Sequence, residues 1–203
     1  MRRCLEGRFR DDRRQGAAMG TDGMGQAAPR VMTIGHSTRE FDEVVRMLRS
    51  NGVTELVDVR SFPNSRKFPQ WNQATIEGAL PAGIGYRWIR DLGGRRHTPA
   101  GTETPNDGWK VKAFRDYADY MSTEAFAAGL AELLAVASCS VPAIMCSEAV
   151  PWRCHRRLVT DALIVAGVEV LDIMSPGTTR RAKLTSFAQV QDGKITYPAT
   201  EGE

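Results

Sequence analysis

Hydrophobic residues fall along the chain in short continuous runs, which alternate with segments of helical periodicity. Short apolar runs bounded by glycine, proline or polar residues are typical of buried strands. Segments in which apolar residues recur three and four positions apart are typical of helices that bury one face. The runs that predict strands are residues 31–35, 54–59, 83–89, 141–145 and 168–173.

The segments between these runs predict helices. A first helix covers residues 41–48, and Ser37 and Glu40 have the spacing of a capping box at its start. Thr123 is placed to cap a helix that runs to about residue 138, and Gly167 is placed to end one over residues 156–166. Shorter helical segments are predicted near residues 72–80 and 114–121, and a hairpin turn is predicted at residues 191–194.

Alternating strands and helices predict an α/β protein, specifically a three-layer α/β/α sandwich with a mostly parallel, Rossmann-like sheet. The first two strands flank one helix, so we expect them to lie side by side. In such sheets, sites form beyond the carboxyl ends of the strands. The candidate loops therefore begin at residues 35, 60, 91, 146 and 174.

Composition and charge refine this prediction only slightly. The chain is 42% hydrophobic and 25% charged, which is ordinary for a globular protein, and its net charge of +3 does not require an acidic partner. Six arginines lie within the first fourteen residues, so we interpret residues 1–29 as a disordered Arg/Gly-rich arm and residues 30–203 as a single α/β domain. No run approaches the ~20 apolar residues of a membrane span, and the start lacks the apolar region of a secretory signal. We expect a cytoplasmic protein with no membrane partner, and the sequence defines no oligomeric state.

The loop after residue 145 carries the richest chemistry. Cys146 lies at a predicted strand tip, Glu148 follows it, and Cys154, His155 and Arg156 stand at the start of the next helix. A helix N-terminus favours negative charge, so a thiol there could ionise near neutral pH and an oxyanion could bind. Cys146, Glu148, Cys154 and His155 are therefore candidate catalytic residues. Three alternatives stay open: an inert strand cysteine, a redox pair of Cys146 with Cys154, and a metal site completed by His155 with Glu148 or His36.

Other predicted strand ends carry candidate binding groups for an anionic substrate. Arginine supplies fork donors for oxyanions, and paired glycines let a backbone approach a ligand closely. A buried ion pair of Asp58 with Arg60 is an equally good interpretation of those two residues. The candidate substrate-binding residues are His36, Ser37, Asp58, Arg60, Arg66, Gly93, Gly94, Arg95, Arg96 and Arg156.

Several ordered motifs resemble the bacterial family DUF488, over roughly residues 31–173. They are residues 33–37, 56–63, 92–96 and 117–121, and the segment from Met145 to Arg156. The family's recurrent cysteine, glutamate and Cys-His-Arg pattern maps onto this last segment, with Ser147 inserted before Glu148. The resemblance implies an α/β fold and brings no established activity.

A weaker resemblance is to rhodanese-like domains, whose early strand is similar to residues 56–60 and whose nucleophile would correspond to Cys146. The spacing departs from that of cysteine-dependent phosphatases and sulfurtransferases, because six residues separate Cys146 from Arg153.

Two hypotheses follow. The first is a cysteine-dependent transferase or hydrolase that acts on an anionic small molecule, with neither a cofactor nor a metal. The second is a nucleic-acid-binding or nucleic-acid-processing module that uses basic loops and aromatic side chains.

Overall fold

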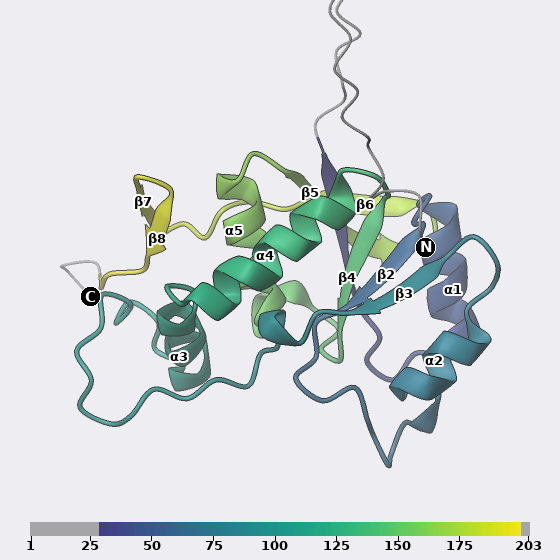
Figure 1. Ribbon diagram of the computed structural model, residues 1–203, viewed down its shortest axis with the longest axis horizontal. Coiled ribbons are helices and arrows are strands. Elements are labelled where there is room, and N and C mark those ends of the chain that lie inside the picture. The colour runs from purple at the N-terminus through teal and green to yellow at the C-terminus, as the bar shows by residue number, and fades with distance from the viewer. Residues whose placement is uncertain (1–28, 200–203) are drawn as a thin grey trace, which may run out of the picture.

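The computed structural model describes residues 29–199, so the predicted arm lies outside it except for its last residue. One sheet has six strands: β1 (Arg30–Gly35), β2 (Glu55–Asp58), β3 (Gly85–Trp88), β4 (Pro142–Cys146), β5 (Glu169–Ser175) and β6 (Thr178–Arg181) (Figure 1). The helices are α1 (Phe41–Ser50), α2 (Gln73–Ala79), α3 (Lys112–Tyr120), α4 (Glu124–Ala137) and α5 (Arg156–Val165). A small hairpin, β7 (Gln189–Gln191) and β8 (Lys194–Thr196), confirms the predicted turn. No helix in this part of the chain is long and apolar enough to cross a membrane.

The sheet is parallel except at one edge. Its strand order is β3-β2-β4-β1-β5-β6, and only β6 runs antiparallel to its neighbour. The expectation that the first two strands lie side by side is wrong, because β4 lies between them and pairs with both. This insertion brings the loop after β4 between the loops after β1 and β2.

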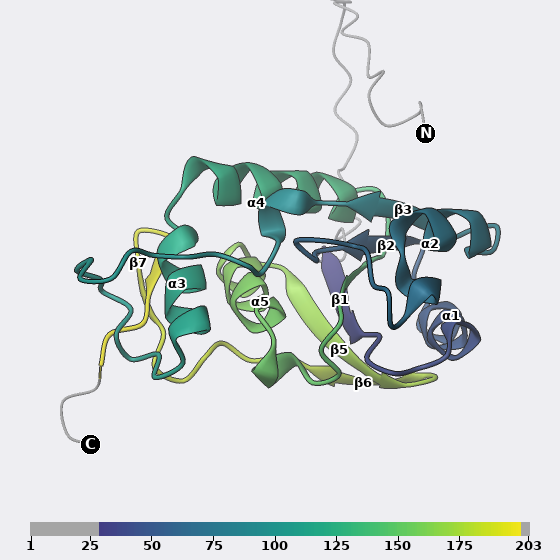
Figure 2. The ribbon, with the colours of Figure 1, turned by 90° about the horizontal axis from the view of Figure 1, so that it is seen from below.

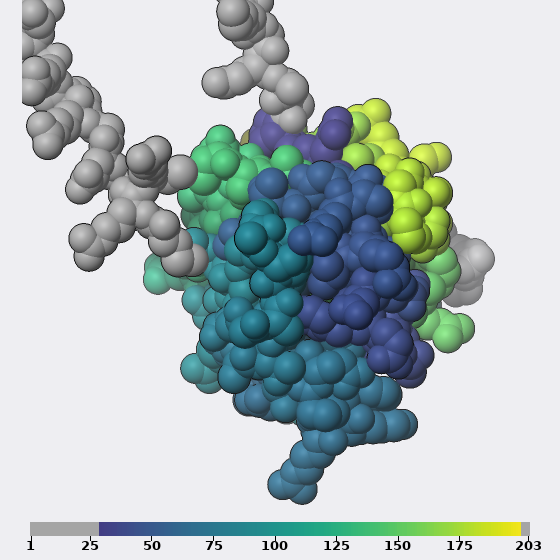
Figure 3. Space-filling model, turned by 90° about the vertical axis from the view of Figure 1, so that its right-hand side faces the viewer, coloured from purple at the N-terminus to yellow at the C-terminus, as the bar shows by residue number. Residues whose placement is uncertain are grey.

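Helices cover both faces of the sheet and confirm the three-layer α/β/α sandwich (Figure 2). Alternate residues of β4 enter two different cores, because successive side chains of a strand point to opposite faces. Ala143 and Met145 pack with α1 and α2, whereas Ile144 and Cys146 pack with α3, α4 and α5. Seen from the side of α1 and α2, the first half of the described chain forms most of the visible face, and later segments appear at its upper edges (Figure 3).

The start of α1 differs from the prediction. Glu40 is the N-cap residue and no side chain caps the helix, so Ser37 does not form a capping box. Ser37 instead adopts a positive φ of 49°, and its backbone N–H donates to the carbonyl of Ser147. The turn after β1 is therefore held against the loop after β4. Thr123, in contrast, caps α4 as predicted, because its side chain accepts from the N–H of Phe126.

Candidate functional site

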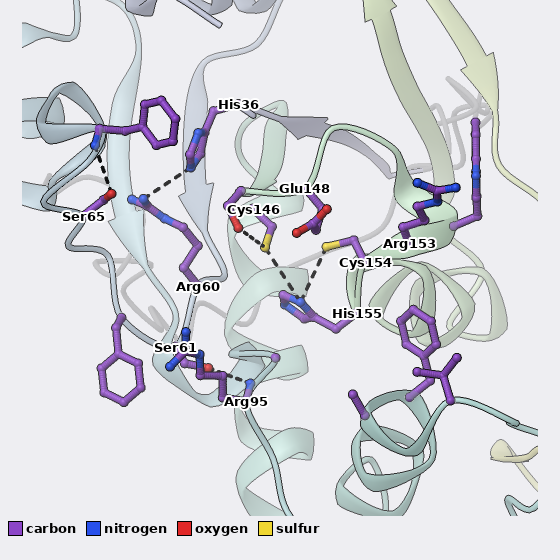
Figure 4. Close-up of a pocket in the computed structure, with 18 of the residues that line it drawn as sticks. His36, Arg60, Ser61, Ser65, Arg95, Cys146, Glu148, Arg153, Cys154 and His155 are labelled. Atoms are coloured by element: carbon purple, nitrogen blue, oxygen red, sulfur yellow. Dashed lines mark hydrogen bonds between the residues drawn. The ribbon is translucent and has the colours of Figure 1, made fainter. Parts of the chain in front are cut away.

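A pocket of about 950 Å³ opens where the loops after β1, β2 and β4 meet (Figure 4). The register brings these loops together, since Gly35 pairs with Cys146 and Asp58 pairs with Met145. The start of α3 and the loop around Gly94 complete the wall. The lining residues are His36, Arg60, Ser61, Phe62, Asn64, Ser65, Phe68, Gly94, Arg95, Val111, Ala113, Phe114, Cys146, Ser147, Glu148, Trp152, Arg153, Cys154 and His155.

Two thiols and one imidazole form a compact cluster on this wall. Cys146 is the last residue of β4, and Cys154 and His155 directly precede α5. The Nδ1 atom of His155 lies 3.6 Å from the Sγ of Cys154 and 3.9 Å from the Sγ of Cys146. All three atoms lie within 4.8 Å of one another, and both cysteines are buried and free of a disulfide. We call these three side chains the thiol–imidazole cluster.

The orientation of the His155 ring is fixed from three sides. Its Nε2 lies 2.9 Å from the carbonyl oxygen of Val59, and since a carbonyl only accepts, Nε2 carries the proton. The ring also packs against Tyr117, with 5.2 Å between the centroids. Gly94 also lies against the ring, where a Cβ atom would come within 2.3 Å of Nδ1. Nδ1 is therefore held facing the two sulfur atoms.

The surroundings of the cluster shift the pKa values of its two cysteines in opposite directions. A hydrogen bond from Cys146, the positive charge of Arg156 and the backbone N–H of Arg156 together lower the pKa of Cys154 to about 6, against the opposing effect of burial. The same hydrogen bond, in which Cys146 is the donor, and burial raise the pKa of Cys146 to about 12. These effects favour the thiolate form of Cys154 over that of the strand-end Cys146.

His36 and Arg60 form the opposite wall. Burial and the charge of Arg60 lower the pKa of His36 to about 4, so its ring is neutral, and it stacks on Trp71 at 4.5 Å between centroids. Arg60 bonds to Asp58 through Nε at 2.9 and 3.0 Å, and Asp58 also accepts from the Tyr86 hydroxyl. Asp58 is fully buried and accepts from Nε and Nη2 of Arg60, whereas Nη1 lies 3.5 Å from Nε2 of His36.

Of the residues expected to bind a substrate, the structure brings His36, Arg60, Gly94 and Arg95 to the pocket with the four candidate catalytic residues. Arg156 does not line it. Its side chain is buried, and its guanidinium donates to the hydroxyl of Thr33 and to the carbonyl of Glu148. Arg156 thus ties the loop after β4 to β1.

The remaining expected residues lie behind or beside the pocket. Arg96 donates to the carbonyls of Arg90, Asp91 and Gly93, and its guanidinium packs 3.7 Å from the ring centroid of Tyr120. Gly93 lies against Ser61, where a Cβ would meet the hydroxyl at 2.8 Å. These residues shape the loop that presents Gly94 and Arg95. Ser37, Asp58 and the exposed Arg66 are also absent from the lining.

Sequence reasoning missed a group of pocket residues. Ser61, Asn64 and Ser65 come from the loop after β2, whose polar composition was a usable signal. Val111, Ala113 and Phe114 come from the start of α3, and no local pattern connects that segment with β4.

The chain matches a known protein family over most of the described residues. Residues 40–163, more than half of the chain, match the family described as domain of unknown function DUF488, and the chain belongs to that family. Its match covers the loop after β2, the Gly93-Gly94 loop, the Tyr117 helix and the thiol–imidazole cluster. No curated protein and no solved structure matches the chain.

Proposed function

We propose that this protein is an enzyme that acts on an anionic substrate, as a hydrolase or transferase, with the thiol–imidazole cluster as its reaction centre. One observation carries the proposal: Cys146, Cys154 and His155 converge at the wall of a roomy pocket whose other charged groups are mainly cationic. A thiolate is the reactive form of cysteine, both as a nucleophile and as a metal ligand.

The charge of the pocket favours a negatively charged substrate. Arg95 and Arg153 are exposed on its wall, and neither forms an ion pair with another described residue. The positive charge of Arg60 is balanced by Asp58, which leaves Glu148 as the one carboxylate on the wall against two unbalanced guanidinium groups. Guanidinium groups bind carboxylates and phosphates through paired hydrogen bonds, so these two arginines are the proposed substrate-binding residues.

Glu148 is placed to manage a proton. It lines the pocket with its side chain exposed, and its backbone carbonyl is fixed by Arg156 (Figure 4). A carboxylate held near a reaction centre serves as a general base or acid. We assign Glu148 this role in the proposed reaction.

A second candidate function is the processing of nucleotides or nucleic acid. Phe62 and Trp152 line the pocket and are 63% and 47% exposed, which is unusual for large aromatic side chains. Exposed aromatics beside arginines are a typical platform for stacking bases while the arginines contact phosphates. This observation favours a nucleotide-containing anion over a small inorganic one.

The binding of inorganic phosphate tests the anion site. We expect Arg95→Ala combined with Arg153→Ala to weaken phosphate binding at least tenfold in isothermal titration calorimetry at low salt. Arg46→Ala is the matched control, because it removes an exposed arginine from α1, away from the pocket. Equal loss in the control and in the pocket variant, or no loss in either, would contradict the proposal.

The same titration with a mononucleotide distinguishes the two candidates. Stacking predicts that the nucleotide binds more tightly than phosphate and that Phe62→Ala with Trp152→Ala removes this difference. If phosphate and nucleotide bind equally in the wild-type protein, the second candidate is wrong.

A further inference from the structure

We propose that Cys146, Cys154 and His155 bind a zinc ion whose open coordination position faces the pocket. The inference deepens the proposed function, and it rests on that function only in taking the same cluster as the reaction centre. The spacing of the three residues along the chain follows no familiar zinc motif, but the fold brings their ligand atoms together in space.

The two nitrogen–sulfur distances in the cluster are close to the edges of a zinc coordination tetrahedron. Zinc binds sulfur at about 2.3 Å and imidazole nitrogen at about 2.0–2.1 Å, so tetrahedral angles place the two ligand atoms about 3.5 Å apart. The Nδ1 of His155 lies 3.6 Å and 3.9 Å from the two sulfurs, and the sulfurs lie within 4.8 Å of each other. A zinc ion therefore fits between the three atoms with side-chain shifts of a few tenths of an ångström at the nitrogen edges.

The hydrogen bond of His155 to the backbone is that of a metal ligand. Its Nε2–H donates to the carbonyl of Val59, which directs Nδ1 at both sulfurs. Two buried sulfur atoms thus converge on a single ring nitrogen, at 3.6 Å and 3.9 Å. A metal-bound histidine commonly donates its second nitrogen to a backbone carbonyl, which fixes the ring and raises its basicity. Val59 provides that outer contact here.

The types of ligand favour zinc over the harder cations. Two thiolates and one imidazole suit zinc, whereas magnesium and calcium prefer oxygen ligands. The ligand atoms of the cluster come from three side chains, and catalytic zinc sites use three protein ligands with a fourth position left to water or substrate. All three residues line the pocket, so that fourth position opens toward the proposed anion site.

Burial shields the proposed ligands, and neighbouring loops hold them in position. Cys146 and Cys154 are 7% and 2% exposed, so bulk water has little access to the metal from behind. Gly94 lies directly against His155 and Gly35 lies against the Glu148 carbonyl, and both glycines permit approaches that any side chain would block. The fold thus holds the ligands in place before the metal binds.

Metal analysis of the full-length protein tests the inference. Purified protein is stripped with a chelator, loaded with zinc alone, passed over a desalting column and analysed by mass spectrometry for metals. We expect about one zinc ion per chain, as in a mononuclear three-ligand site. Cys146→Ser, Cys154→Ser and His155→Ala should each lower retained zinc at least tenfold. Cys139→Ser is the matched control, because Cys139 is an exposed cysteine at the other end of β4, and it should retain the full amount.

Loading the wild-type protein with cobalt(II) gives a second readout that needs no variant. Intense visible bands of four-coordinate cobalt, with a thiolate-to-cobalt charge-transfer band, are expected. If the wild-type protein retains no zinc, if the cobalt spectrum lacks thiolate charge transfer, or if Cys139→Ser loses as much zinc as the cluster variants, the inference is overturned.

The phosphate titration separates this inference from the proposed function. If the wild-type protein retains no zinc but binds phosphate in a way that depends on Arg95 and Arg153, the zinc site alone is overturned. If the wild-type protein retains zinc but binds phosphate no more tightly than the variant that lacks Arg95 and Arg153, the zinc site is supported and the anion site is overturned.

Discussion

Removing Asp58 is expected to destabilise the protein strongly, because it would leave Arg60 buried without its counter-ion. The Asp58 side chain is 0% exposed and that of Arg60 is 8% exposed. Asp58 accepts from Nε, Nη2 and the backbone N–H of Arg60 and from the Tyr86 hydroxyl. Breaking a buried pair by removing one partner costs about 3–5 kcal/mol. We therefore expect Asp58→Ala to lower the free energy of unfolding by that amount.

A double-mutant cycle shows whether the loss comes from the pair itself. Asp58→Ala combined with Arg60→Met removes both charges, and the double variant should be destabilised by clearly less than the sum of the two single variants, with a coupling of about 1–3 kcal/mol. The assay is urea unfolding followed by circular dichroism, with the slope of free energy against urea compared between variants.

The exposed pair of Arg39 with Glu43 provides the control. Its side chains are 26% and 43% exposed, so Glu43→Ala should cost no more than about 0.5 kcal/mol. A loss below about 1 kcal/mol in Asp58→Ala, or strict additivity in the cycle, would refute the assignment of Asp58 and Arg60 as one buried pair.

Three further predictions follow from the same geometry. His36 has a pKa of about 4 in the folded protein and an ordinary value of 6.5 when unfolded, so the unfolded chain takes up its proton at a higher pH than the folded protein. Stability should therefore fall by roughly 3 kcal/mol between pH 6.5 and pH 4. Urea unfolding at several pH values should show this fall in the wild-type protein and not in His36→Gln. Gly94→Ala should destabilise the fold by about 1–3 kcal/mol and displace His155, which nuclear magnetic resonance would show as a shift of its imidazole signals. Gly78→Ala, whose added Cβ meets no atom within 4 Å, should be neutral or stabilising. In chelator-treated protein, alkylation of Cys154 by iodoacetamide should rise with a midpoint near pH 6, and a midpoint above pH 8 would contradict the assigned thiolate.

The fold was largely predictable from the sequence because strand and helix patterns are local. The position of β4 was not, since pairing between β1, β4 and β2 depends on contacts over more than eighty residues. Helical periodicity also located α1 correctly, but the backbone bond from Ser37 to Ser147 replaced the predicted cap. Local patterns thus define elements, and long-range backbone contacts decide how their ends are joined.

The candidate site was predictable in location and only partly in the role of each residue. Glycines and arginines after strands suggested contact with a ligand, yet Gly93 and Gly94 approach Ser61 and His155 of the protein itself. Arg156 is a second case, because its guanidinium reaches back to Thr33 in the core. A sequence does not distinguish a side chain that faces a ligand from one that supports the wall behind it, because both need the same residue types.

Protection of Cys154 from alkylation by phosphate tests the central claim most directly, because it requires the thiol and the anion site to share one pocket. Chelator-treated protein is labelled with iodoacetamide at neutral pH, with and without inorganic phosphate, and each cysteine is quantified by peptide mass spectrometry. We predict that phosphate slows the labelling of Cys154 but not of Cys139, and that Arg95→Ala with Arg153→Ala abolishes this protection. Equal labelling of Cys154 with and without phosphate would contradict a reaction centre within an anion-binding pocket.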